Sequence, residues 1–213
     1  MTPTVASIQV GLPEDHLLPV PWRSAFFKRA VSGPLMLRRL NLDGDGQADL
    51  ENHGGPDQAA LCYSAGHYPA WEAELGRALP HGGFGENFTI DGLDETSVCL
   101  GDVYSTGEAV LQVSAHRGPC YKIAYRWQLP ELLELVRTSG RTGWYVRVLR
   151  EGLVQAGEPF VLLERPNPDW SMQRVYRAWE GRRKNRAEAM GIAACAGAAA
   201  DYLEGLAKLA RGS

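Results

Sequence analysis

The chain changes character around residue 165, where Pro166 and Pro168 stand two positions apart. Proline lacks a backbone N–H and fixes φ, so two prolines interrupt any regular element that would cross this point. Residues 1–164 are rich in glycine, proline and short apolar runs, whereas residues 170–210 are rich in alanine, arginine and leucine and contain no proline. We therefore expect two domains, residues 1–164 and residues 165–213.

The first domain is predicted to be mainly β. Its short runs alternate apolar and polar residues or are rich in β-branched residues, and Gly, Asp and Pro turns separate them. They cover residues 5–10, 34–40, 87–90, 98–104, 109–114, 144–148 and 160–163. So many short strands are typical of a sheet closed on itself, so we predict a closed β-barrel-like domain. Two short helices are expected within it, at residues 68–75 and 130–137.

The second domain is predicted to be a small appendage of three helices. After Asp169 as the expected N-cap, apolar side chains recur at helical spacing at Met172, Val175, Tyr176 and Trp179. A second helix is expected at residues 199–210 and a third around residues 187–194. Apolar stripes of this kind are usually packing faces, so no site is expected here.

Charge and hydropathy exclude several classes of protein. The net charge is −3, and no polybasic block occurs in the first 160 residues, which argues against a duplex nucleic-acid partner. No apolar stretch approaches the length of a membrane span, and the N-terminus lacks the pattern of a secretory leader. A cytoplasmic protein with no nucleic-acid or membrane partner is therefore expected.

Cysteine usage narrows the chemistry further. The four cysteines are widely spaced and form no Cys-x-x-Cys pair: Cys62, Cys99, Cys120 and Cys195. This spacing excludes the usual zinc-ribbon and iron–sulfur motifs and makes a disulfide framework improbable in a reducing compartment. Cys62, Cys99 and Cys195 are assigned to packing.

Cys120 is the candidate reactive residue. It follows the expected strand at residues 109–114 and stands between two cations, Arg117 and Lys122. Nearby positive charge favours the anionic thiolate, which is the form that binds soft metals or attacks electrophiles. The alternative is that Cys120 is a small buried hydrophobic residue, as free cysteines often are.

Two glycine-rich segments are candidate ligand-binding loops. The first, at residues 51–59, contains His53, Gly54, Gly55 and Asp57, and the second, at residues 82–89, contains Glu86 and Asn87. Glycines let backbone N–H groups approach a ligand closely, and an asparagine side chain suits the edge of a pterin or purine. Each segment alone is equally consistent with a plain turn, and neither is a known phosphate-binding motif.

The order of the motifs carries more information than any one of them. The motifs lie at residues 28–34, 45–49, 53–57, 85–87, 101–102 and 117–120. This succession resembles the MOSC family, the domain found at the C-terminus of molybdenum cofactor sulfurases. Within the family the chain is most similar to the YiiM-like, or 6-N-hydroxylaminopurine resistance, type, which carries a three-helix domain after the barrel.

The resemblance implies a molybdenum–pterin cofactor with Cys120 as both metal ligand and catalytic residue. It also implies that Arg117 and Lys122 offer charge to the cofactor. The remaining residues that it places around the pocket are His53, Gly54, Gly55, Asp57, Glu86 and Asn87. The activity implied is reduction of N-hydroxylated bases or related compounds from N–OH to N–H, a detoxification.

Two other functions remain open at this point. Cys120 could carry a persulfide and relay sulfur, or the protein could be a non-catalytic carrier of the cofactor. A reductase would act on a small N-hydroxylated base and, because the chain lacks iron–sulfur, flavin and nicotinamide motifs, would need a separate electron-donor protein. The sequence leaves the oligomeric state open, a homodimer included.

Overall fold

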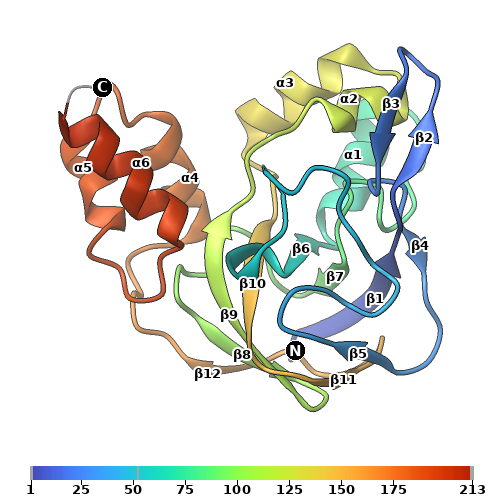
Figure 1. Cartoon of the computed structure of the whole chain (residues 1–213), viewed down its shortest axis with the longest axis horizontal. Coiled ribbons are helices and arrows are strands. Elements are labelled where there is room, and N and C mark those ends of the chain that lie inside the picture. The colour runs from blue at the N-terminus through green and yellow to red at the C-terminus, as the bar shows by residue number, and fades with distance from the viewer. Residues whose placement is uncertain (1, 52, 212–213) are drawn as a thin grey trace.

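The computed structural model, which describes residues 2–51 and 53–211, is built around one eight-stranded sheet (Figure 1). Neighbouring strands are antiparallel except for one parallel pair, β6 and β7. The strand order across the sheet is β12 (Val161–Glu164), β8 (Val103–Thr106), β9 (Ala109–His116), β10 (Trp144–Arg150), β6 (Ala60–Ser64), β7 (Phe88–Asp91), β1 (Thr4–Val10) and β4 (Arg29–Ala30).

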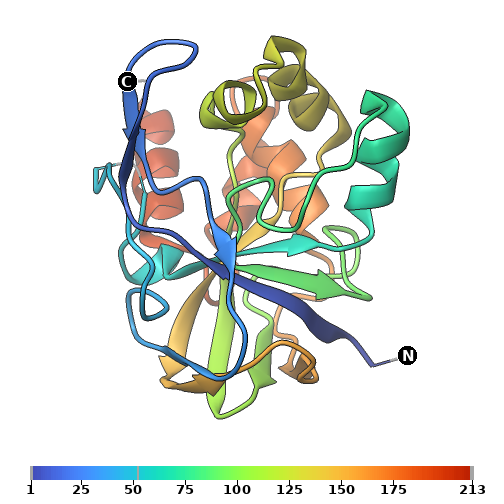
Figure 2. The same ribbon diagram turned by 90° about the vertical axis from the view of Figure 1, so that its right-hand side faces the viewer.

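The sheet is strongly curled (Figure 2), which confirms a mainly β fold, but the prediction of a closed barrel was wrong. Within the described residues no pairing joins the two edge strands, β12 and β4, so the sheet is a half-barrel. Both edges are short, since β4 has two residues and β12 has four, all four of them exposed. Short edge strands offer too few backbone groups to close a ladder.

Two small two-stranded sheets accompany the main sheet. One joins β2 (Glu14–His16) to β3 (Trp22–Ser24), and the other joins β5 (Leu35–Leu37) to β11 (Gly152–Val154). The first pair leads directly into residues 24–28, which border the pocket described below.

Three helices and one 3-10 turn cover one end of the sheet: η1 (Pro56–Gln58), α1 (His67–Leu75), α2 (Lys122–Trp127) and α3 (Pro130–Ser139). The helices share a core of their own with β6, in which Tyr63, Trp71 and Phe84 stack. The helix predicted at residues 68–75 is α1, and that predicted at residues 130–137 is α3. Both end at a glycine with positive φ, Gly76 and Gly140, a conformation that glycine adopts without steric cost.

The C-terminal segment forms three helices on the other side of β9: α4 (Met172–Glu180), α5 (Arg186–Ile192) and α6 (Ala200–Arg211) (Figure 1). The cap of α4 is Ser171, not Asp169 as predicted, because the Ser171 hydroxyl accepts a hydrogen bond from the backbone N–H of Arg174 at 3.3 Å.

These helices share one continuous apolar core with the sheet, and the cluster runs from Val113 and Trp144 to Met172, Ile192 and Leu206. The division of the chain into two domains at residue 164 stays a prediction. No helix in the described ranges is long and apolar enough to cross a membrane.

Candidate functional site

A pocket with an empty volume of about 620 Å³, its open mouth included, lies where β6 and β7 begin and where β1 and β9 end. The Cys120 side chain is half-buried in its wall. The lining comes from five separate stretches of chain: Ser24, Ala25, Phe26 and Lys28; Gly46, Gln47, Ala48, Asp49, His53, Gly54, Gln58 and Leu61; Gly85 and Asn87; Arg117, Cys120 and Lys122; and Tyr145. The fold therefore brings together six of the predicted site residues: His53, Gly54, Asn87, Arg117, Cys120 and Lys122.

Cys120 lies on a four-residue connection between β9 and the turn that starts α2. The carbonyl of Cys120 accepts a hydrogen bond from the N–H of Ile123 at 3.1 Å, which fixes the thiol at the start of the helix. At the other end of the connection, the N–H of Arg117 donates to the carbonyl of Gly143 at 3.2 Å. The cysteine connection is thus held at both ends by backbone hydrogen bonds.

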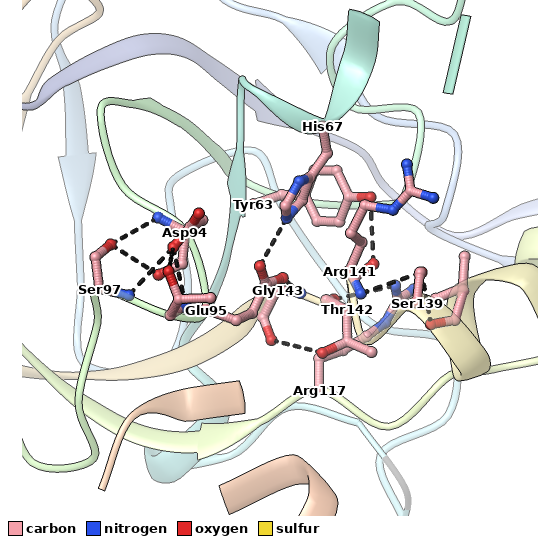
Figure 3. A network of polar contacts seen from close by, with 12 residues as sticks. Tyr63, His67, Asp94, Glu95, Ser97, Arg117, Ser139, Arg141, Thr142 and Gly143 are labelled. Carbon is pink, nitrogen blue, oxygen red and sulfur yellow. Dashed lines mark hydrogen bonds and ion pairs between the residues drawn. The ribbon is translucent and has the colours of Figure 1, made fainter. Parts of the chain in front are cut away.

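The loop that holds Arg117 is itself fixed by a buried carboxylate (Figure 3). Glu95 is 3% exposed and accepts the N–H of Gly143 at 2.6 Å with one oxygen, while its other oxygen lies 2.6 Å from Nε2 of His67. Gly143 has φ +81°, and a Cβ there would lie 2.4 Å from the carbonyl of Cys62. Only glycine fits this close approach, so residue 143, whose carbonyl accepts the N–H of Arg117, must be a glycine.

The cations of the pocket differ in how their charges are balanced. Lys28 forms an ion pair with the buried carboxylate of Asp45. Arg117 is 3% exposed and its guanidinium donates to backbone carbonyls, including that of Phe84 at 2.9 Å. Lys122 is 7% exposed, and neither it nor Arg117 has a carboxylate partner in the described part of the chain. Two nearly buried, uncompensated positive charges therefore lie beside the thiol, which favours an anionic ligand.

Nδ1 of His53 and Oε1 of Gln58 belong to the pocket lining and are buried without a hydrogen-bond partner among the described residues. The nearest carboxylate oxygen to His53 Nδ1 belongs to Asp49, at 3.6 Å, too far for a hydrogen bond. Burial and then the charge of Lys122 lower the pKa of His53, with Asp49 acting in the opposite direction. His53 is therefore neutral near pH 7, and its ring can donate or accept a hydrogen bond from a ligand.

Asn87 shapes the pocket wall with a side chain that is already fully engaged. Its Oδ1 accepts the N–H of Leu61 at 3.1 Å, and its Nδ2 donates to the carbonyl of Gln9 at 3.2 Å and to Asp45 at 2.9 Å. The amide ties the starts of β6 and β7 to the end of β1. It can contribute surface to a ligand but has little hydrogen-bonding capacity left.

Three predicted site residues do not line the pocket: Gly55, Asp57 and Glu86. Glu86 is fully buried and its carboxylate accepts the N–H groups of Gly82 at 2.6 Å and Phe84 at 3.0 Å, so it organises the second glycine-rich segment from behind. Asp57 pairs with Arg147 at 2.9 Å and accepts the N–H of Ala200 at 2.9 Å. The direct ligand-binding role of these three residues stays a prediction.

The residues that line the pocket with a functional group but were not predicted as site residues are Ser24, Lys28, Gln47, Asp49, Gln58 and Tyr145. Lys28 lies in the ordered motif at residues 28–34, Gln47 and Asp49 lie in that at residues 45–49, and Gln58 lies in the first glycine-rich segment, so these four had a local signal. Tyr145 lies within β10 and reaches the pocket only because β10 pairs with β9 and β6. Nothing in the local sequence predicts that placement.

A fold of this kind, with a cysteine connection after a central strand and glycine-rich loops around it, defines a class of protein. A model of the MOSC domain matches residues 49–161, which contain the first glycine-rich segment, the second and Cys120. The chain belongs to the MOSC domain family.

Individual relatives extend the likeness to nearly the whole chain. YflK of Bacillus subtilis is 48% identical over 150 residues, which are 70% of this chain and 68% of that protein. A protein of Gibberella moniliformis named "Reductase" is 39% identical over 162 residues, 73% of this chain but 29% of that longer protein. The crystal structure of YiiM from Geobacillus stearothermophilus superposes with a TM-score of 0.82 at 33% identity, over 97% of this chain and 98% of that one.

Proposed function

We propose that this MOSC protein binds a molybdenum–pterin cofactor in the pocket, with Cys120 as the metal ligand. The observation that carries the proposal is the pair of nearly buried cations, Arg117 and Lys122, beside a half-buried thiol and without carboxylate partners. A phosphorylated pterin with a metal centre presents the anionic groups that would balance these charges. A thiolate is a suitable ligand for a soft or high-valent metal.

The residues of the pocket fit such a group. Nδ1 of His53 and Oε1 of Gln58 offer hydrogen bonds that no atom of residues 2–51 and 53–211 takes up. Leaving a buried polar atom unpaired costs about 1–3 kcal/mol, so a ligand that pairs with it gains affinity. Phe26 and Tyr145 add aromatic surface to the lining. The aromatic residues near Cys120 in the sequence, Tyr121 and Tyr125, are not among the lining residues.

We further propose that the activity is reduction of N-hydroxylated bases or related compounds. When bound, the molybdenum centre would supply the two-electron chemistry that turns N–OH into N–H. The balance requires two electrons and two protons for each hydroxylamine, with an amine and water as products. The pocket residues would orient the cofactor. The ammonium group of Lys122, which lines the same pocket as Cys120, would attract the anionic groups of the cofactor. The name of the Gibberella relative supports a reductase.

The electrons must reach the site from outside the chain. Cys62, Cys99 and Cys195 are buried free cysteines, and none of them lines the pocket with Cys120. The described residues also hold no group of three or more His, Cys, Asp or Glu side chains arranged to bind a metal ion. We propose a separate electron-donor protein as partner.

Turnover tests this function. The protein, expressed in a host that makes the pterin cofactor, is expected to reduce 6-N-hydroxylaminopurine when a chemical reductant supplies electrons, and Cys120→Ala is expected to lose the activity. Turnover that survives in Cys120→Ala contradicts the proposal. A loss of activity accompanied by a mass gain of one sulfur atom on wild-type Cys120, after incubation with a persulfide donor, favours sulfur relay instead.

A further inference from the structure

The C-terminal helix α6 contacts His116, the last residue of β9, which directly precedes the cysteine connection. The hydroxyl of Tyr202 accepts the backbone N–H of His116 at 2.7 Å and also contacts Nδ1 of the same histidine. The two rings stack at 5.5 Å with an angle of 18°. Burial lowers the pKa of His116 and favours its neutral form, in which Nδ1 can accept the proton of the Tyr202 hydroxyl. One side chain of α6 thus fixes both the backbone and the ring of the residue that directly precedes Arg117.

The same helix also contacts the back of the first glycine-rich segment. Oδ2 of Asp57 accepts the N–H of Ala200, the first residue of α6, at 2.9 Å. A carboxylate at this position satisfies one of the free N–H groups of the helix and complements its dipole. Asp57 directly precedes Gln58, which lines the pocket.

Ser114 of β9 completes the connection between the two contacts. Its hydroxyl donates to the carbonyl of Asp57 at 2.5 Å, and its carbonyl accepts the N–H of Ala199 at 3.0 Å. The helix, the strand that leads to Cys120 and the segment that carries His53 are therefore joined by hydrogen bonds at one place.

We propose that α6 is a clamp that fixes the cysteine connection relative to the first glycine-rich segment, and that Tyr202 is the positioning residue of this clamp. Tyr202 is 4% exposed, and neither Tyr202 nor His116 lines the pocket, so Tyr202 acts on Cys120 through the backbone of residues 116–120. The helical segment then sets the position of the thiol. This inference does not depend on which group the thiol binds.

Thiol reactivity tests the clamp. Cys120 is alkylated with iodoacetamide under native conditions, in protein from a host that cannot make the pterin cofactor, and the modified peptide is followed by mass spectrometry. Tyr202→Phe keeps the packed ring but removes both hydrogen bonds to His116. We expect Cys120 to react roughly fivefold faster in this variant, the factor that corresponds to a loss of about 1 kcal/mol of hydrogen-bond free energy.

Leu206→Ala is the matched control. Leu206 lies one turn further along α6, is 1% exposed and belongs to the apolar core, so its truncation destabilises the fold without touching His116. We expect its Cys120 rate to stay close to that of the wild type. The inference is overturned if Tyr202→Phe reacts at the wild-type rate, or if Leu206→Ala accelerates the reaction as much. If Tyr202→Phe does not fold, Asp57→Ala gives the same test, because it removes the hydrogen bond between Asp57 and the N–H of Ala200. Faster alkylation of Cys120 is expected in this variant, and an unchanged rate overturns the clamp.

Discussion

The buried cations beside the thiol differ in what their charge costs the fold. Lys28 is paired with Asp45, whereas Lys122 has no carboxylate partner among the residues that the structure describes. Burying an unpaired charge costs several kcal/mol, whereas removing one partner of a buried pair leaves the other charge uncompensated. A buried lysine without an ion-pair partner therefore weakens the fold unless a ligand of opposite charge offsets that cost.

This difference predicts opposite effects of two like substitutions. Without cofactor, Lys122→Met is expected to raise the free energy of unfolding by about 1 kcal/mol, because an unpaired buried charge is replaced by an apolar chain of similar length. Lys28→Met is expected to lower it by about 3 kcal/mol, because Asp45 is left without its partner. Denaturant unfolding of the two variants measures both. A loss of stability in Lys122→Met as large as that in Lys28→Met contradicts the assignment of Lys122 to ligand binding.

His116 predicts a pH dependence of stability. Burial, with a smaller contribution from Arg182, lowers the pKa of His116 to about 3 from an ordinary value of 6.5. Between about pH 6.5 and pH 3, His116 is therefore protonated in the unfolded chain and neutral in the folded protein. The contribution of His116 to the free energy of unfolding is fully present above pH 6.5 and is lost as the pH falls. One such group contributes up to about 1.4 kcal/mol for each pH unit in this window.

His116→Asn isolates this contribution, since Oδ1 of an asparagine can still accept the hydroxyl of Tyr202 but does not titrate. Between pH 6.5 and 4.5 the free energy of unfolding of the variant is expected to fall by about 2 kcal/mol less than that of the wild type. Denaturant unfolding at several pH values measures the difference. If the free energy of unfolding falls equally with pH in the wild type and in His116→Asn, the burial of a neutral His116 is contradicted.

The elements that the sequence predicted are those with a clear local period. All seven predicted strand runs overlap strands of the structure, and α1, α3 and the three C-terminal helices lie close to their predicted ranges. The missed elements lack such a signal. β6 is buried at all five positions and shows no alternation, and α2 has only six residues. The closed barrel was wrong because closure depends on the pairing of distant edges, which no local pattern encodes.

The candidate site was predictable to the extent that its residues lie in the motif segments. Cys120, Arg117 and Lys122 follow one strand, and the pocket indeed forms around them. Glu86 and Asp57 lie in the right segments but do not line the pocket: Glu86 accepts N–H groups of its own segment, and Asp57 accepts the N–H of the first residue of α6. Spacing in the sequence shows which loop approaches a site, whereas tertiary contacts decide which way each side chain turns.

The helices α4, α5 and α6 predict how the chain responds to shortening. Met172, Val175, Ile192 and Leu206 belong to the same apolar cluster as Val113 and Trp144 of the sheet. A fragment of residues 1–164 would expose one face of this cluster to water. We therefore expect the fragment to lack a cooperative thermal transition by circular dichroism. A cooperative transition close to that of the whole chain would instead establish residues 1–164 as an independent domain.

At the scale of the whole molecule, the sheet brings distant stretches of the chain to one pocket, and the helical segment supports that pocket from behind. The thiol, the unpaired cations and the two unpartnered polar atoms meet only in the folded chain. In the proposed cofactor site, one atom of this convergence binds the metal, Sγ of Cys120.

Molybdenum content by elemental analysis tests that claim most directly. The wild type, Cys120→Ala and Cys195→Ala are purified from a host that makes the pterin cofactor; Cys195 is a buried cysteine outside the pocket and serves as the control. We predict close to one molybdenum atom per chain in the wild type and in Cys195→Ala, and little in Cys120→Ala. Equal molybdenum in all three proteins, or none in any of them, would contradict the assignment of Cys120 as the metal ligand.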